Sequence, residues 1–145
     1  MLTVWNIELD QKSVLVVDDE LDILRVIKRS LEADGGVNHV YAFTSPIEAL
    51  EHFKLNYNNF VLVLSDIRMP GMTGFEFIKR IKQINPTTKV LLMSAFEIDD
   101  TELSMALGSI MIDDFVQKPV SPRQLTSIIQ RHIISNVGNY YNTRT

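Results

Sequence analysis

The stretch VLVVDDE, residues 14–20, frames the interpretation of the whole chain. Its four leading apolar residues are typical of a strand that is buried on both faces. Three acids follow without a spacer, although adjacent carboxylates repel one another and each prefers water. The stretch therefore predicts either a cation bound at the end of a core strand or acids that cap the next helix.

Length and composition favour one globular domain. The chain has 145 residues, of which 46% are hydrophobic, and a chain of this length buries about two-thirds of its unfolded surface in one core. Its net charge of −4 without a basic cluster argues against direct binding of nucleic acid, since phosphate contacts need grouped Lys and Arg.

The sequence also bears on cellular location. Cysteine is absent, which excludes disulfides and thiolate metal sites. The N-terminus MLTVWNIELD lacks the basic region and long apolar core of a signal peptide, and no apolar run approaches the ~20 residues that cross a membrane. We therefore expect a cytoplasmic protein without a membrane partner.

Strand-like and helix-like segments alternate along the chain. The strand candidates are short apolar runs at residues 14–17, 40–43, 60–64, 90–93 and 115–116. Between and after them, apolar residues recur at helical spacing on five segments: Leu24, Ile27 and Leu31; Ile47, Leu50 and Phe53; Phe77, Ile81 and Ile84; Leu103, Ala106 and Ile110; Leu125, Ile128, Ile129 and Ile133.

Four of the predicted helices have recognisable starts. The motifs SPIE (45–48), TGFE (73–76), DDTE (99–102) and SPRQ (121–124) each place an acid or amide three residues after an N-cap residue. Pro46 and Pro122 fall at the first helical position, where a missing N–H is tolerated. Five strand-then-helix units predict a doubly wound α/β fold, with a parallel sheet between two layers of helices.

The predicted domain occupies residues 12–135. Residues 1–11 are interpreted as an N-terminal extension, and the polar segment 136–145 is expected to be a frayed C-terminal tail.

Polar side chains follow four of the predicted strands. Asp18 and Asp19 follow the first strand, Asp66 the third, Ser94 the fourth and Lys118 the fifth. In an open α/β sheet, ligands bind beyond the carboxyl ends of the strands, so these groups are expected to meet. Three carboxylates suit Mg²⁺, and a hydroxyl and an ammonium are donors for phosphate oxygens. The set predicts a phosphoryl group on a carboxylate with Mg²⁺ beside it.

The chain resembles the receiver domains of two-component response regulators. The matching pieces are VLVVDDE, LSDIRMPGMTGFEF, LLMSAF and DDFVQKPV, which together cover residues 13 to about 134. The resemblance implies a flavodoxin-like fold, in which five helices flank a five-stranded parallel sheet in the order 2-1-3-4-5.

The resemblance also implies roles for the site residues. Asp66 would accept the phosphoryl group. Asp19 and Asp66 would bind Mg²⁺ directly, together with the backbone carbonyl of Arg68, and Asp18 would act on the metal through water.

Further implied roles concern the phosphoryl group and the response to it. Ser94 and Lys118 would bind phosphoryl oxygens, with a cis bond between Lys118 and Pro119. Ser94 and Phe115 would form the conformational switch. Phosphoryl loss would be tuned by the residues two after Asp66 and two after Ser94, which are Arg68 and Phe96.

The chain departs from the family pattern at three places. Ser94 stands where Thr is common, Phe115 stands where Tyr is common, and Met111 occupies the position of the Gly that usually ends the fourth helix. The nearest glycine is Gly108.

The function implied is that of a single-domain response regulator. A histidine kinase or histidine phosphotransfer protein would supply the phosphoryl group, and the signal would pass to an unknown downstream protein. A homodimer through the fourth helix, fifth strand and fifth helix is a further expectation. The chain would catalyse only its own phosphorylation and dephosphorylation, so it would not be an enzyme in the usual sense.

Other interpretations remain at this point. Asp19 is also a suitable helix cap, and Asp66 is a suitable turn acid. Independently of these two, Phe96 would only pack on the fourth helix. A degenerate receiver would bind proteins without phosphorylation. A Mg²⁺-dependent hydrolase would have its aspartyl nucleophile at the end of the first strand and its second acid two residues later. Residue 20 is Glu20, and the best nucleophile of this chain lies on the third strand. A flavodoxin-like cofactor protein is a further alternative. The phosphate of a flavin would need hydrogen-bond donors and positive charge, whereas the loops at the strand ends are acidic.

Overall fold

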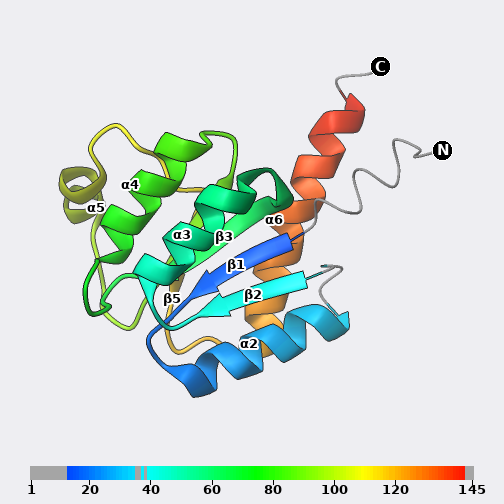
Figure 1. Ribbon diagram of the computed structural model, residues 1–145, viewed down its shortest axis with the longest axis horizontal. Coiled ribbons are helices and arrows are strands. Elements are labelled where there is room, and N and C mark those ends of the chain that lie inside the picture. The colour runs from blue at the N-terminus through cyan, green and yellow to red at the C-terminus, as the bar shows by residue number, and fades with distance from the viewer. Residues whose placement is uncertain (1–12, 35–36, 38, 143–145) are drawn as a thin grey trace.

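The computed structural model describes residues 13–34, 37 and 39–142, with only the backbone described for 134–142. Strands and helices alternate along this part of the chain (Figure 1). Five strands form one parallel sheet in the order β2-β1-β3-β4-β5, which confirms the predicted topology. They are β1 (Ser13–Val17), β2 (His39–Phe43), β3 (Phe60–Asp66), β4 (Lys89–Ser94) and β5 (Asp114–Gln117).

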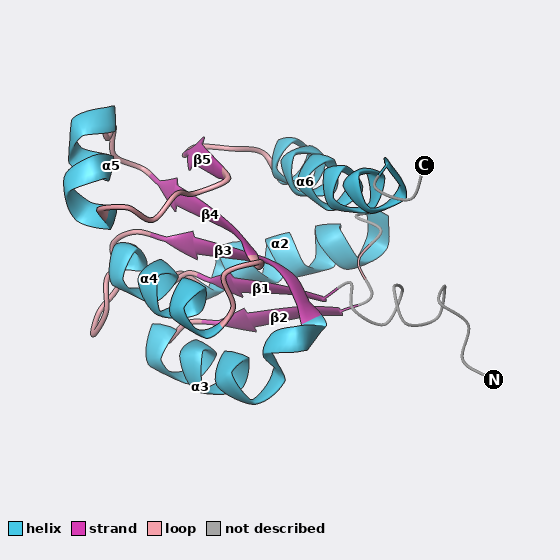
Figure 2. Ribbon diagram, turned by 90° about the horizontal axis from the view of Figure 1, so that it is seen from above, coloured by secondary structure: helices cyan, strands magenta, loops and turns pink. Residues whose placement is uncertain are grey.

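Helices cover both faces of the sheet, as a doubly wound fold requires. In Figure 2, α2 and α6 lie on one side of the strands and α3 and α4 on the other. No helix of the described residues is long and apolar enough to span a membrane. The helices are α2 (Leu21–Asp34), α3 (Pro46–Asn56), α4 (Gly74–Ile84), α5 (Asp100–Leu107) and α6 (Pro122–Asn142), with a 3₁₀ turn η1 (Tyr57–Asn59) before β3.

The apolar run of the first strand serves two cores. Every residue of β1 is buried. Val14 and Val16 pack into the cluster that includes the apolar faces of α2 and α6, whereas Leu15 and Val17 pack into the cluster that includes α3 and α4. Because successive side chains of a strand point to opposite faces, a strand between two helix layers needs a continuous apolar run.

The predicted helix starts are confirmed. In all four motifs, the side-chain oxygen of the first residue accepts a hydrogen bond from the backbone N–H three residues on, at 2.8 to 3.3 Å. Ser121 and Gln124 form a complete capping box, because the Ser121 N–H also donates to Gln124 Oε1 at 3.1 Å.

The end of α5 differs from the prediction. Gly108 has a φ of +64°, and its N–H donates to the Ser104 carbonyl. A positive φ is readily adopted only by glycine and stops the helix there. Ile110, which was expected on the helical stripe, therefore lies beyond α5, and the glycine that ends the helix is Gly108 rather than a residue at position 111.

The C-terminal segment is a second correction. The predicted tail at 136–145 is helical as far as Asn142, and residues 143–145 lie outside the described part. The single glycine in this stretch costs a helix only about 1 kcal/mol, and polar residues do not themselves end one. The predicted extension at 1–11 also lies outside the described residues.

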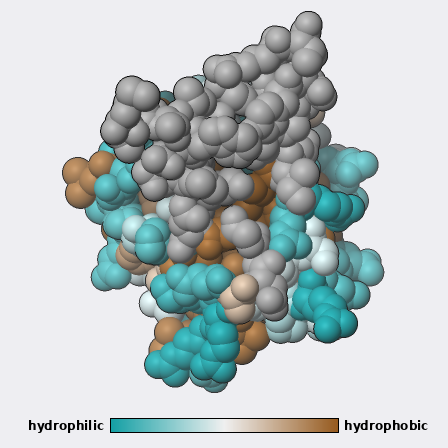
Figure 3. Space-filling model, turned by 90° about the vertical axis from the view of Figure 1, so that its right-hand side faces the viewer, coloured by the Kyte–Doolittle hydropathy of each residue, from teal (hydrophilic) through white to brown (hydrophobic). Residues whose placement is uncertain are grey.

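Strand direction determines where a site can form. The five strands are parallel, so their carboxyl ends meet at one edge of the sheet, toward which the arrows of β1 and β2 point in Figure 1. Figure 3 shows the opposite side, where hydrophilic groups surround hydrophobic atoms near the centre. The polar residues that follow the strands therefore lie together on the edge facing away from that view.

Candidate functional site

Three carboxylates meet at the carboxyl edge of the sheet. Asp18 and Asp19 follow β1, and Asp66 ends β3. One oxygen from each lies within 4.8 Å of the others. Asp18 is fully buried, Asp66 is 8% exposed, and Asp19 is exposed to solvent. Like charges this close need a compensating cation.

Lys118 supplies part of the compensation. Its Nζ lies 2.8 Å from Asp18 Oδ2 and 3.7 Å from Asp66 Oδ2. Asp18 Oδ1 also accepts the backbone N–H of Glu20 at 2.9 Å. Both oxygens of Asp18 therefore have partners, whereas Asp66 is only loosely paired with the lysine.

The electrostatic balance sets Asp66 apart. Burial, followed by the charge of Asp18, raises the pKa of Asp66 above its ordinary value, although Lys118 and the Ile67 N–H act against this. Burial lowers the pKa of Lys118, but its hydrogen bond to Asp18 and the nearby carboxylates outweigh burial and raise it. The lysine is therefore charged, and burial together with the charge of Asp18 opposes ionisation of Asp66.

One oxygen of Asp66 is positioned by the backbone. The Ile67 N–H donates to Asp66 Oδ1 at 3.0 Å, while Oδ2 is the atom nearer Lys118. A Cβ added at Gly74 would clash with the Asp66 carbonyl oxygen and lie 2.8 Å from the Ile67 Cα. Gly74 is the second residue of the TGFE motif, but a helix-start motif does not by itself require glycine there. The lack of a side chain at Gly74 lets α4 begin directly against the backbone of Asp66.

Ser94 and Lys118 come from adjacent strands. Ser94 ends β4 and is 2% exposed. Its Oγ accepts the N–H of Phe96 at 3.0 Å, so the hydroxyl hydrogen remains available to another acceptor. The Lys118 N–H donates to the Ser94 carbonyl at 2.8 Å. The predicted cis bond between Lys118 and Pro119 is confirmed.

Gln117, which no sequence motif predicted as a site residue, contacts both Ser94 and Lys118. The Gln117 amide donates to the carbonyls of Ser94 and Lys118 at 3.1 and 3.2 Å. No sequence signal marks it, because a single exposed amide at the end of a strand is ordinary.

Two further predicted residues lie beside each other. Arg68 follows β3 and Phe96 follows β4, and the guanidinium Cζ lies 3.8 Å from the ring centroid. Phe96 is 49% exposed. Phe115 is partly buried against the cluster on the α3 and α4 side of the sheet. Its switch role and the Arg68 carbonyl ligand stay predictions.

The donor set fits a divalent cation. When all are ionised, the three Asp carboxylates and the Lys118 ammonium have a net charge of two negative units. The three atoms that could bind a metal are all carboxylate oxygens, which are hard ligands. Mg²⁺ prefers oxygen ligands and keeps several waters. The exposure of Asp19 leaves one side of the cluster open to solvent.

Comparisons with known proteins agree with this geometry. The sequence pattern of the family described as response regulator receiver domain matches residues 14–130. Transcriptional regulatory protein YvrH of Bacillus subtilis is 34% identical over 126 residues, which are 86% of this chain and 50% of YvrH.

Solved structures agree as well. A receiver domain protein from Clostridium thermocellum is 33% identical with a TM-score of 0.73, covering 86% of this chain and 95% of that one. The chemotaxis response regulator CheY4 of Vibrio cholerae is 29% identical with a TM-score of 0.69, covering 83% and 97%.

The curated relatives are longer than this chain. The chain spans about half of their length or less. The single-domain organisation and the cytoplasmic location expected from the sequence therefore stay predictions.

Proposed function

This chain belongs to the response regulator receiver domain family, and we propose that Asp66 accepts a phosphoryl group from a partner's phosphohistidine in an Mg²⁺-dependent reaction. One observation carries the proposal. Lys118 Nζ bonds Asp18 Oδ2 at 2.8 Å but lies 3.7 Å from Asp66 Oδ2. Asp66 Oδ2 therefore lies near a positive charge without being tightly paired to it.

The two oxygens of Asp66 take different parts in the reaction. Oδ1 is held by the Ile67 N–H, so Oδ2 is the nucleophile. Its electron pair forms the new bond to phosphorus while the bond between phosphorus and the donor's histidine nitrogen breaks. The histidine leaves with that bonding pair, and the product is an aspartyl phosphate.

Other side chains neutralise the transferred group. Ser94 and Lys118 donate hydrogen bonds to phosphoryl oxygens. Asp18, Asp19 and Asp66 would hold Mg²⁺, which when bound supplies positive charge beside the transferring phosphoryl group. Because Lys118 Nζ already lies 3.7 Å from Asp66 Oδ2, a short shift brings the lysine to a phosphoryl group on that oxygen.

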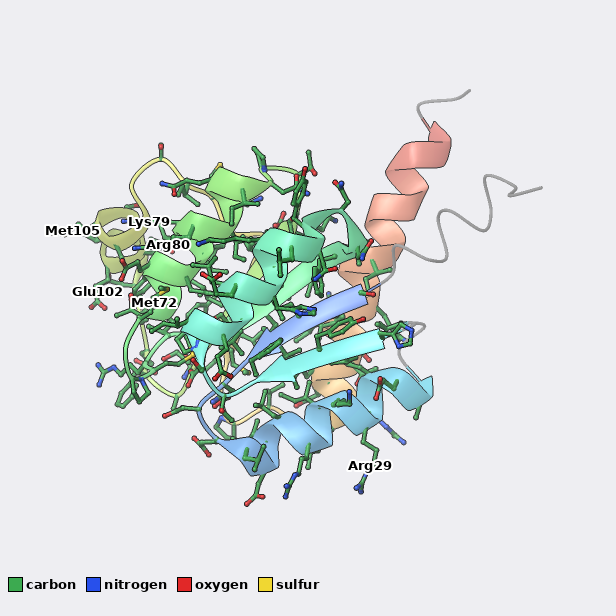
Figure 4. All side chains as sticks on the ribbon, in the orientation of Figure 1. Arg29, Met72, Lys79, Arg80, Glu102 and Met105 are labelled. Carbon is green, nitrogen blue, oxygen red and sulfur yellow. The ribbon has the colours of Figure 1, made fainter. Side chains whose placement is uncertain are left out.

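We also infer a route from the site to a partner. The phosphoryl group adds about 1.5 to 2 negative charges, toward which the Ser94 hydroxyl turns. Phe115, two residues before Gln117 on the neighbouring β5, then repacks. The surface of α5 is suited to a downstream protein or a second copy, because Met105 is 82% exposed and projects outward with Glu102 (Figure 4).

Intact mass measurement tests the proposal without a known partner. The chain is incubated with a small acyl phosphate, with Mg²⁺ or with a chelator. The proposal expects one phosphoryl adduct that appears only with Mg²⁺. Absence of an adduct with Mg²⁺ would favour a degenerate receiver, and steady hydrolysis of a phosphomonoester without an adduct would favour a hydrolase.

A further inference from the structure

The side chain of Gln117 links the two residues that would bind the phosphoryl group. Its Nε2 lies 3.1 Å from the Ser94 carbonyl oxygen and 3.2 Å from the Lys118 carbonyl oxygen. Both neighbours are acceptors, so the amide must present its NH₂ group to them, and each hydrogen serves one carbonyl. The opposite amide orientation would place oxygen against two oxygens.

The link lies where regular strand pairing ends. The paired register of β4 and β5 runs as far as Ser94 and Gln117. The Lys118 N–H adds one more bond to the Ser94 carbonyl at 2.8 Å. Pro119 follows and has no N–H, so it cannot extend the ladder. At this point the Gln117 amide joins the backbones of both strands.

These backbones carry the phosphoryl-binding groups from different strands. The Ser94 hydroxyl and the Lys118 ammonium must reach oxygens of one phosphoryl group, and small misplacements of such donors weaken their effect strongly. Gln117 itself is exposed on β5 and donates to backbone carbonyls only. It therefore acts on the phosphoryl group through Ser94 and Lys118.

We propose that Gln117 is a positioning residue that holds Ser94 and Lys118 at the spacing needed to bind one phosphoryl group. The inference rests on the proposed phosphorylation of Asp66. Phosphoryl binding and Mg²⁺ binding can be tested separately, because the Gln117 amide bonds none of the three clustered carboxylates. Loss of its donors should weaken phosphoryl binding and leave the Mg²⁺ affinity unchanged.

Beryllofluoride, a phosphoryl mimic, tests this separation. Gln117→Met keeps a side chain of similar length and removes both donors. Gln83→Met is the matched control, because Gln83 is exposed on α4 away from the carboxyl edge. Beryllofluoride affinity is measured by fluorine NMR at saturating Mg²⁺, Mg²⁺ affinity by calorimetry, and Tm by thermal unfolding.

We expect Gln117→Met to weaken beryllofluoride binding about fivefold, because misplacement of the Ser94 and Lys118 donors loses roughly the energy of one modest hydrogen bond to the mimic. Mg²⁺ affinity should match that of Gln83→Met and the wild type, and Tm should fall by only about a few degrees because two hydrogen bonds of the folded state are lost. Hydrogen exchange of the Lys118 amide should become faster, because its acceptor is less firmly held.

Three outcomes would overturn the inference. Unchanged beryllofluoride affinity would show that the amide positions nothing. Parallel losses of Mg²⁺ affinity, beryllofluoride affinity and Tm would indicate a general structural role. Failure of the wild type to bind beryllofluoride would remove the proposed function together with this inference, whereas the first two outcomes leave the proposed function intact.

Discussion

The guanidinium of Arg68 lies over the ring of Phe96, with Cζ 3.8 Å from the ring centroid. The two residues come from different loops, two positions after Asp66 and two after Ser94. Their contact therefore bridges the loops that follow β3 and β4 beside Asp66. Neither side chain is a general base near neutral pH, because arginine stays protonated and phenylalanine does not titrate.

We predict that this pair slows loss of the phosphoryl group. Phe96→Ala or Arg68→Ala removes the contact and opens a path for water, so decay should accelerate about two- to fivefold, matching the energy of an exposed cation–π contact. The protein is phosphorylated, the donor removed and the adduct followed by mass. Glu97→Gln, at an exposed neighbouring position, serves as control. Unchanged or slower decay in both variants would refute the role.

Mg²⁺ should depend more on Asp19 than on Asp18. Both Asp18 oxygens are already bonded, to Lys118 and to the Glu20 N–H, whereas Asp19 is exposed. Asp19→Ala should weaken Mg²⁺ binding roughly tenfold or more, and Asp18→Ala should weaken it less. Calorimetric titration of both variants checks this. A larger loss in Asp18→Ala, or equal affinities in both variants, would contradict the assignment.

The raised pKa of Asp66 predicts a pH-dependent stability. The folded protein holds this proton more tightly than the unfolded chain, so the associated stability is present below the ordinary value of 3.8 and is lost as pH rises through the raised pKa. At neutral pH the ionised carboxylate therefore destabilises the metal-free fold. Asp66→Asn should increase the free energy of unfolding by about 0.5 to 2 kcal/mol.

Denaturant unfolding in chelator, at several pH values, measures this effect. The advantage of Asp66→Asn should shrink as pH falls toward 3.8, where the wild-type carboxyl is protonated. Glu97→Gln is again the control. A variant that is less stable than the wild type at neutral pH would show that the pairing of Asp66 with Lys118 outweighs its burial.

Much of the fold was accessible from sequence because its signals are local. Apolar runs mark strands buried on both faces, and N-cap motifs mark four helix starts. The ends of α5 and α6 were harder to predict. Gly108 ends α5 by adopting a positive φ, which competes with the apolar spacing that extends to Ile110. The polar composition after residue 135 does not stop α6.

The residues of the site were predicted from the sequence, but the ion pairs and hydrogen bonds between them were not. Strand ends identify Asp18, Asp66 and Lys118, because parallel strands bring them to one edge. The preference of Lys118 for Asp18 depends on differences of about an ångström. The same holds for the Gln117 link, because hydrogen bonds between a side chain and distant carbonyls leave no periodic pattern in the sequence.

Phosphorylation should move Ser94 and Phe115 together. Ser94 Oγ now accepts the Phe96 N–H, and Ser94 pairs with Gln117, two residues after the partly buried Phe115 on β5. A turn of Ser94 toward a phosphoryl group is therefore expected to change the packing of Phe115. Beryllofluoride with Mg²⁺ should shift the NMR signals of the Phe115 ring, and Ser94→Ala should reduce that shift by about half or more. Identical Phe115 spectra with and without beryllofluoride would remove the proposed coupling.

The most direct test of the account is to locate the phosphorylated residue. After incubation with an acyl phosphate and Mg²⁺, borohydride reduces an aspartyl phosphate to homoserine, and peptide mass mapping finds its position. Homoserine should appear at position 66, and Asp66→Asn should yield neither adduct nor homoserine. Homoserine at another carboxylate, or an adduct on Asp66→Asn that forms at the wild-type rate, would contradict the account.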